Sequence, residues 1–175
     1  MQLVIGGGST LPAKLEITTS NPDETQALGK SLGQLARPGD IFLLTGPLGA
    51  GKTCLVQGLA RGLDIEGLTP SPTFMLAREY RQGRLPLYHL DLYRLEFKEV
   101  AELGIDEYLY GGGIAAVEWA EKDPALMSEE CLLIAITYAD DEGARHLHLA
   151  PQGARYTDLL SDLASKLDKG NKTCI

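Results

Sequence analysis

Cysteine is scarce in this sequence of 175 residues, and its three copies, Cys54, Cys131 and Cys174, show no CxxC spacing. An odd number of cysteines without paired spacing argues against a disulfide framework and against a zinc site. A chain of this length can bury roughly 70% of its unfolded surface, so its fold needs neither. We therefore expect a cytoplasmic protein, in which Cys131 is a small core residue within an apolar run.

Long apolar runs are missing as well. No stretch of the sequence approaches the ~20 apolar residues that span a bilayer. The first residues, Met1–Gly6, lack the basic region and the long apolar segment of a signal peptide. The sequence therefore predicts a protein without a membrane partner.

Positive charge is in deficit. The chain has 16 Lys and Arg residues against 24 Asp and Glu residues, which gives a formal net charge of −8. Nucleic-acid-binding proteins usually present a basic face, because contact with phosphates releases counterions. The deficit argues against DNA as a partner and against tight RNA binding by this chain alone. If the protein serves RNA chemistry, we expect a partner protein, and not this chain, to contact the RNA.

The length indicates one domain, because about 100 to 200 residues are typical of each domain. We find no internal repeat and no linker that divides the chain. We expect residues 15–168 to form the domain, residues 1–14 to be an N-terminal extension and residues 169–175 to be a frayed tail. Within the extension, Leu3–Ile5 could instead pair as an edge strand.

Buried strands and amphipathic helices alternate along the domain. Consecutive apolar residues predict strands covered on both faces at Ile41–Leu44 and Ile114–Val117. Helices are expected over Lys52–Leu63 and Tyr156–Leu167, and a pair of strands is expected to turn at Gln82-Gly83. These elements predict an α/β fold of three layers, with a mostly parallel central sheet and an antiparallel hairpin extension.

The strongest motif is Gly46-Pro47-Leu48-Gly49-Ala50-Gly51-Lys52-Thr53, which matches GxxxxGK[ST] between a buried strand and a helix. Glycines let the backbone wrap so that successive N–H groups point at phosphates, and the helix adds its positive end. Lys52 can reach the β- and γ-phosphate oxygens, and Thr53 can offer a hydroxyl to Mg²⁺. A glycine-rich turn without a ligand would not explain Lys followed by Thr. The motif predicts a nucleotide-binding set of Gly46, Leu48, Gly49, Ala50, Gly51, Lys52, Thr53 and Cys54.

A carboxylate should face this loop, because Mg²⁺ prefers hard oxygen ligands. Glu118 closes a consecutively apolar strand, and an acid at the carboxyl end of a central strand faces the ligand crevice. Asp91 closes an alternating strand and lies close to Arg94. For Asp91, metal contact and an ion pair with arginine remain equally open. Glu118 is the favoured acid.

Four segments, in this order, resemble the TsaE family: the 46–53 motif, Ser71-Pro72-Thr73-Phe74, His89-Leu90-Asp91-Leu92-Tyr93-Arg94-Leu95, and Val117-Glu118-Trp119. The resemblance as a whole covers roughly Thr18 to Leu149, most of the chain. The resemblance implies a P-loop NTPase fold and a weak Mg²⁺-dependent ATPase. It further implies work with the proteins TsaD and TsaB in placing threonylcarbamoyl on the tRNA adenosine next to the anticodon.

The resemblance also implies roles for single residues. Thr53 and Asp91 would hold Mg²⁺. Glu118 would contact the metal or its water and polarise the attacking water, and Lys52 would neutralise the phosphates.

Two further residues receive roles in the same way. Trp119 would lie close to the nucleotide, and Thr73 would lie in a loop resembling a nucleotide-sensing switch. Pro47 stands where the family often has an acidic residue, which affects loop stiffness but not the phosphate ligands.

Two other functions share the loop. A small-molecule kinase would need an arginine-rich lid, for which residues 78–94 are a possible stretch. A guanine-binding switch would carry Asn-Lys-x-Asp, and the nearest match, Asn171-Lys172-Thr173-Cys174, lacks the Asp.

Histidines and one arginine complete the candidates. His146 and His148 are expected on a solvated strand face rather than around a metal, and His89 is expected beside the site or in the core. Arg145 could approach the nucleotide base.

Overall fold

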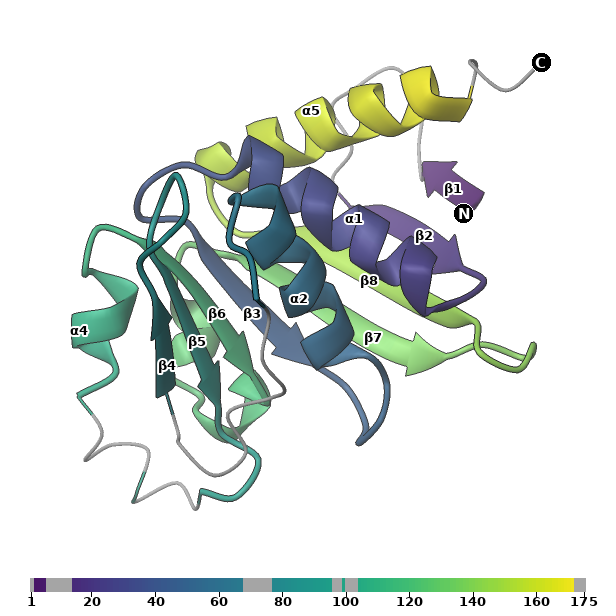
Figure 1. Ribbon diagram of the computed structural model, residues 1–175. Helices are drawn as coiled ribbons and strands as arrows, with labels where there is room; N and C mark the ends of the chain where they lie inside the picture. Colours follow the sequence, from purple (N-terminus) through teal and green to yellow (C-terminus); the bar gives the residue numbers. More distant parts are fainter. Residues whose placement is uncertain (1, 6–13, 68–76, 96–98, 100–103, 172–175) are drawn as a thin grey trace.

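A mixed sheet of eight strands runs through the computed structural model, which describes residues 2–5, 14–67, 77–95, 99 and 104–171 (Figure 1). The strand order is β1-β2-β8-β7-β3-β6-β5-β4. The strands are β1 (Gln2–Ile5), β2 (Leu15–Thr19), β3 (Ile41–Thr45), β4 (Ala77–Tyr80), β5 (Leu87–Asp91), β6 (Ile114–Glu118), β7 (Leu132–Tyr138) and β8 (Arg145–Pro151). The helices are α1 (Pro22–Leu35), α2 (Lys52–Gly62), α4 (Asp106–Leu109) and α5 (Ala154–Asn171), with 3₁₀ turns η1 (Ala120–Lys122) and η2 (Leu126–Ser128).

The centre of the sheet is parallel, since β7, β3, β6 and β5 pair in parallel. Antiparallel strands flank this centre, with β8, β2 and β1 on one side and β4 on the other. The predicted α/β fold with a parallel core and a β4–β5 hairpin is therefore confirmed. Residues Gln2–Ile5 form the edge strand that was one of the two alternatives for the N-terminal segment. The division at residues 15 and 168 stays a prediction.

Helices cover the sheet on both faces and complete three layers. Helices α1, α2 and α5 lie on one face (Figure 1), while α4, η1 and η2 contribute to the apolar cluster of the other face. Among the described helices, none has the length and apolar character needed to cross a membrane. The parallel strands all end at one edge, which is where loops that bind ligands gather in such sheets.

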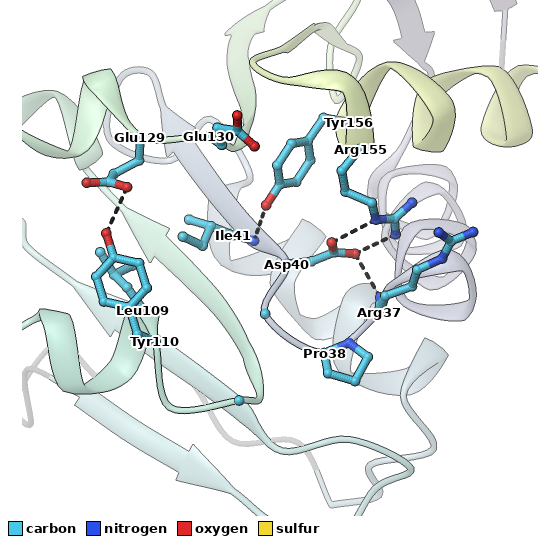
Figure 2. A pocket seen from close by; sticks show the side chains of 12 residues that line it. Arg37, Pro38, Asp40, Ile41, Leu109, Tyr110, Glu129, Glu130, Arg155 and Tyr156 are labelled. Atoms are coloured by element: carbon cyan, nitrogen blue, oxygen red, sulfur yellow. Dashed lines mark hydrogen bonds and ion pairs between the residues drawn. The ribbon is translucent and has the colours of Figure 1, made fainter.

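A polar cluster at the opposite edge ties α5 to β3 (Figure 2). Arg155 donates from Nε and Nη2 to the two carboxylate oxygens of Asp40, at 2.9 and 2.6 Å. The same carboxylate accepts from the main-chain N–H of Arg37 at 2.7 Å. The N–H of Ile41 donates to the hydroxyl of Tyr156 at 2.7 Å. Two adjacent residues of α5 are thus bonded to the start of the central strand.

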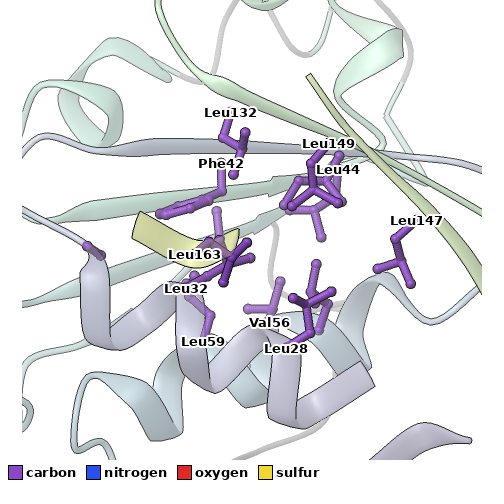
Figure 3. Close-up of a cluster of buried hydrophobic side chains, with 14 of the residues drawn as sticks. Leu28, Leu32, Phe42, Leu44, Val56, Leu59, Leu132, Leu147, Leu149 and Leu163 are labelled. Atoms are coloured by element: carbon purple, nitrogen blue, oxygen red, sulfur yellow. The ribbon is translucent and has the colours of Figure 1, made fainter. Parts of the chain in front are cut away.

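The larger apolar core lies between the sheet and α1, α2 and α5 (Figure 3). Strand β3 serves both faces, because Phe42 and Leu44 point into this core and Ile41 and Leu43 into the cluster on the other side. This explains the unbroken apolar run that the strand shows in the sequence. The labelled core residues are Leu28, Leu32, Phe42, Leu44, Val56, Leu59, Leu132, Leu147, Leu149 and Leu163.

Helices α1 and α2 approach each other at glycines. A β-carbon added to Gly29 would lie 2.2 Å from the carbonyl oxygen of Leu55, and one added to Gly58 would lie 2.1 Å from that of Gln26. Contacts this short with main-chain atoms leave no room for any side chain. Helix α2 begins at Lys52, within the predicted phosphate loop. The contact of α2 with α1 therefore also fixes the position of the loop's carboxyl end.

Candidate functional site

The 46–53 loop, Gly46–Thr53, connects the carboxyl end of β3 to the first turn of α2. Gly46 has φ 126° and Gly51 has φ 109°, a region that favours glycine. A β-carbon at Gly46 would also lie 2.1 Å from the carbonyl oxygen of Ile136 on β7. The loop therefore starts in close contact with the neighbouring strand, and only glycine fits there.

The ammonium group of Lys52 lies inside the loop. Its Nζ donates to the carbonyl oxygens of Gly46 and Pro47, at 2.6 and 2.9 Å. The same atom lies 3.8 Å from the centroid of the Trp119 ring, a cation–π distance. Lys52 is only 4% exposed. The loop thus positions one buried positive charge at its mouth.

Two acids lie next to this charge at the ends of neighbouring strands. Asp91 and Glu118 are paired in the register of β5 and β6, and both are buried. The hydroxyl of Thr53, in the first turn of α2, donates to Oε2 of Glu118 at 3.0 Å. Burial lowers the pKa of Lys52, and the carboxylates of Glu118, Glu121 and Asp91 oppose that shift. The hydroxyl of Thr53, the ammonium group of Lys52 and the carboxylates of Asp91 and Glu118 therefore lie together at the end of the 46–53 loop.

A buried histidine fixes Glu118 from the other side. His89 Nε2 donates to Oε1 of Glu118 at 2.8 Å, and both side chains are 3% exposed. Of the two expectations for His89, contact with the site is the one observed. Both oxygens of Glu118 are thereby held, one by Thr53 and the other by His89.

Aromatic side chains cover the mouth of the loop. The rings of Tyr93 and Trp119 lie 4.8 Å apart, and Trp119 has φ 61°, which is uncommon for a residue other than glycine. Lys122 donates to the carbonyl oxygens of Tyr93 and Leu95. The segment after β5 and the segment after β6 are thus bonded together over Lys52.

These groups enclose a cavity of about 270 Å³. Its lining combines loop residues with residues at the ends of β5 and β6: Leu48, Gly49, Ala50, Gly51, Lys52, Thr53, Asp91, Tyr93, Glu118 and Trp119. The structure therefore brings together most of the residues that the sequence proposed for a nucleotide and a metal. Their binding and catalytic roles stay predictions.

The side chain of Cys54 is not part of this cavity. The thiol of Cys54 donates to the carbonyl oxygen of Pro22 at 3.3 Å, so its side chain points at the start of α1. Burial raises the pKa of Cys54, which keeps its thiol neutral. Thr73 lies outside the residues that the structure describes. A nucleotide contact for either residue stays a prediction.

Tyr138 was not among the residues that the sequence proposed for the site, and Arg145 was proposed only as a residue near the nucleotide base. Tyr93 appeared only within the segment that resembles the TsaE family, without a role of its own. Tyr138 and Arg145 bond to carbonyl oxygens of Leu48 and Ala50 in the loop. No local pattern marks the loop contacts of Tyr138 and Arg145, because these two residues lie at least 85 positions from the loop and reach it through the pairing of β7 with β3 and β8.

A larger hollow of about 540 Å³ lies at the amino ends of the parallel strands (Figure 2). Its polar groups bond to one another: Arg155 to Asp40, Ile41 to Tyr156, and Tyr110 to Glu129 at 2.8 Å. Ligands of open parallel sheets bind instead at the carboxyl ends of the strands. We therefore assign the candidate site to the smaller cavity.

Metal ligation by protein side chains alone is not indicated. In the described part of the chain, no three His, Cys, Asp or Glu side chains are grouped to hold a metal ion. His146 contacts Thr18 at 2.9 Å, and His148 contacts Glu16 at 3.3 Å, so each has a partner on β2. This agrees with the expected polar strand face. Mg²⁺ usually takes only one or two protein ligands and completes its shell with phosphate and water.

Comparison with known proteins decides the family. A family model described as threonylcarbamoyl adenosine biosynthesis protein TsaE matches residues 19–147, which include every residue lining the 270 Å³ cavity. The chain belongs to the TsaE family. It is 43% identical over 151 residues to the tRNA threonylcarbamoyladenosine biosynthesis protein TsaE of Bacillus subtilis, covering 86% of this chain and 94% of the relative.

Two more TsaE comparisons agree. The TsaE protein of a Nostoc species is 43% identical over 156 residues, covering 87% of this chain and 95% of the relative. The crystal structure of Bacillus subtilis YdiB superposes with a TM-score of 0.74 at 39% identity, covering 87% of this chain and 95% of that chain. TsaE membership and the α/β fold are therefore established together.

Proposed function

We propose that this protein binds and hydrolyses Mg²⁺-ATP at the 46–53 loop. In the same proposal, it serves the threonylcarbamoyl modification of the tRNA adenosine next to the anticodon. Membership of the TsaE family supports the pathway. The observation that supports the chemistry is the convergence of Lys52, Thr53, Asp91 and Glu118 on one cavity beside a glycine loop.

The residues present fit both ATP and its metal. The loop offers main-chain N–H groups and one ammonium, which suit phosphate oxygens. The hydroxyl of Thr53 and the carboxylates of Asp91 and Glu118 are the hard oxygens that Mg²⁺ prefers. When bound, Mg²⁺ would neutralise charge on the phosphate oxygens.

The chain's own residues then divide the work. Lys52 neutralises the β- and γ-phosphate oxygens. Glu118 orients the attacking water, since a carboxylate has about four lone-pair sites and Thr53 and His89 occupy only two of them. Trp119 and Tyr93 shield the mouth of the loop from bulk water. The reaction is in-line attack of that water on the γ-phosphate.

Partner proteins complete the proposal. The net charge of −8 suits a subunit that does not grip tRNA itself, and we infer that TsaD and TsaB make that contact in the cytoplasm. The guanidinium of Arg145 faces the loop carbonyls, Arg81 pairs with Glu79, and Arg84 bonds to carbonyls of α1. Within residues 78–94, the contacts of Arg81 and Arg84 with their own chain count against an arginine-rich lid of a kinase. A partner-supplied arginine would accelerate hydrolysis by about 10³- to 10⁵-fold.

Titration calorimetry with Mg²⁺-ATP tests the binding step. Lys52→Ala should weaken binding by at least about tenfold, because one charged phosphate contact is removed from a buried site. Lys30→Ala removes the same charge from the exposed side of α1 and should bind like the unchanged protein. Equal affinity of Lys52→Ala and Lys30→Ala would refute the site.

Phosphate release tests hydrolysis. The protein alone should turn over slowly, and TsaD with TsaB should accelerate it. Glu118→Ala should retain Mg²⁺-ATP and lose turnover with the partners present. Equal rates with and without the partners would exclude the proposed dependence, and loss of nucleotide by Glu118→Ala would make this acid a scaffold instead of a catalytic residue.

A further inference from the structure

The β7–β8 hairpin extends beyond the end of the central strand. Strand β3 ends at Thr45, which pairs with Ala135 of β7, whereas β7 continues to Tyr138. The last three residues of β7, Ile136–Tyr138, therefore have no β3 residue beside them. The 46–53 loop occupies this place, as the close approach of Gly46 to Ile136 indicates.

Two side chains at the end of the hairpin bond to carbonyl oxygens of the loop. Tyr138 Oη donates to the carbonyl of Leu48 at 2.5 Å, and Arg145 Nε donates to the carbonyl of Ala50 at 2.9 Å. The Nη2 of Arg145 lies 3.5 Å from the carbonyl of Gly49. Thus three consecutive loop carbonyls face the hairpin.

The two side chains also support each other. Tyr138 and Arg145 are paired in the register of β7 and β8, and the guanidinium carbon lies 4.8 Å from the ring centroid. Arg145 Nη1 additionally donates to the carbonyl oxygen of Ala144 at 2.7 Å. The guanidinium is therefore held over the ring with its Nε directed at the loop.

These bonds set the orientation of the loop amides. In a planar trans peptide, the C=O of one residue and the N–H of the next point in opposite directions. With the carbonyls of Leu48 and Ala50 turned to the β7–β8 hairpin, the N–H groups of Gly49 and Gly51 are turned the opposite way. The cavity lies on that side, because its remaining lining comes from the ends of β5 and β6.

We propose that Tyr138 and Arg145 are positioning residues for the phosphate loop, which pre-orient its amides toward the polyphosphate of the nucleotide. This inference rests on the proposed nucleotide binding. Neither residue touches the phosphates: both act through main-chain carbonyls on the far side of the loop. They reduce the reorientation that the loop undergoes when it binds, and this raises affinity.

Tyr138→Phe gives a narrow test, because it removes one hydroxyl and keeps the ring beside Arg145. Tyr138 is 53% exposed, so the core should stay intact. The matched control is Tyr110→Phe, which removes an exposed hydroxyl bonded to Glu129 at the opposite edge of the sheet. Calorimetry with Mg²⁺-ADP should show about three- to tenfold weaker binding for Tyr138→Phe and no change for Tyr110→Phe.

Arg145→Lys is the companion variant, with Arg81→Lys as its control on the exposed β4–β5 turn. A lysine keeps the charge but cannot direct an Nε at Ala50, so Mg²⁺-ADP binding should again weaken by about three- to tenfold. Since the lost bonds lie at the surface loop and not in the core, the melting temperature without nucleotide should fall only slightly. The rise in melting temperature caused by Mg²⁺-ADP should shrink.

Three outcomes overturn the inference. The first is that both variants bind Mg²⁺-ADP as tightly as the unmodified protein, which would show that the hairpin bonds do not orient the loop. A melting temperature that falls equally with and without nucleotide shows a purely structural role. If Arg145→Lys weakens adenine nucleotides and leaves guanine nucleotides unchanged, Arg145 contacts the base. By contrast, absence of binding by the unmodified protein refutes the proposed function itself.

Discussion

Glu118 is held by side chains from two different elements. Its two oxygens accept from Thr53 and His89, which belong to α2 and β5, and its own strand lies between β3 and β5. A carboxylate fixed by two donors holds one geometry, which is what orienting a water requires. In the proposed mechanism, the contact with His89 therefore helps Glu118 to orient the attacking water.

His89→Leu should lower partner-stimulated ATP hydrolysis by about tenfold or more. A hydrogen bond to a charged group is worth about 1.5–3 kcal/mol, and its loss frees Oε1 of Glu118 to rotate. His89→Gln can still donate from its amide and should keep most of the activity. Steady-state phosphate release at saturating ATP measures both variants, with melting temperatures as a check on folding. Equal activity of the Leu and Gln variants would show that His89 only fills space.

The sequence alone located much of this site. The 46–53 motif, Asp91 and Glu118 could be recognised because a glycine motif and an acid at the end of an apolar strand are local patterns. His89 was expected beside the site or in the core and Arg145 near the nucleotide base, but the groups that they contact could not be predicted. Their contacts depend on which strands are neighbours and in which register, and strand register is set by tertiary packing.

At the scale of elements, the contact of α1 with α2 holds the loop's helix in place. Four glycines, Gly29, Gly33, Gly58 and Gly62, let the two backbones meet. The apolar faces of both helices could be predicted from their periodicity. The close approach of the two helices could not be predicted. Glycines spaced along a helix can equally lie on a face exposed to solvent, and only the position of the second helix shows that they lie at a contact.

Gly58→Ala should lower the free energy of unfolding by about 1–3 kcal/mol. Alanine favours a helix by about 1 kcal/mol over glycine, but its β-carbon would lie 2.1 Å from the carbonyl oxygen of Gln26, and overpacking of this kind costs about 1–3 kcal/mol. Since both atoms are held by helical backbone, the helices must separate, and we expect the clash to outweigh the propensity gain. Urea unfolding measures the change.

Lys30→Ala is the control for this change, because it places an alanine on the exposed side of α1. It should leave the free energy of unfolding within about 0.5 kcal/mol of the original. A Gly58→Ala protein as stable as this control would show that α1 and α2 separate without cost.

At the scale of the whole molecule, the two edges of the sheet differ in what they carry. The carboxyl edge carries the candidate site, and the amino edge carries the polar cluster in which α5 joins β3 through Arg155 and Tyr156. The parallel core could be predicted from the apolar strands Ile41–Leu44 and Ile114–Val117. The strand order, with the last helix anchored beside the first residue of the central strand, depends on contacts between segments over 100 positions apart and left no mark in the sequence.

The amino edge predicts a loss of stability in alkali. Burial, the largest cause, raises the pKa of Tyr156 to about 12, from an ordinary value of 10.0. The folded protein therefore keeps its phenolic proton at a pH where the unfolded chain has lost it. The stability from this group is complete below pH 10 and is lost as the pH rises towards 12. A pKa difference of about two units between the folded and unfolded states corresponds to about 2–3 kcal/mol in the free energy of unfolding.

Urea unfolding between pH 8 and pH 11.5 measures this loss. Cys131, whose pKa burial also raises to about 12 from 9.0, adds a loss that begins near pH 9. Tyr156→Phe removes only the tyrosine contribution, so the stability of this variant should fall less steeply above pH 10. Identical slopes for the variant and the original protein would contradict the assignment.

The strand order also has a consequence for synthesis. The 46–53 loop leaves the ribosome early, but Glu118 follows Thr53 by 65 positions and Arg145 follows Ala50 by 95. Strands β6 and β7, which border β3 on its two sides, both come later in the chain. When the 46–53 loop has just emerged, neither Glu118 nor the β7–β8 hairpin has yet left the ribosome. Under the proposed function, we therefore expect the nascent chain to retain a nucleotide only after the β7–β8 hairpin has emerged.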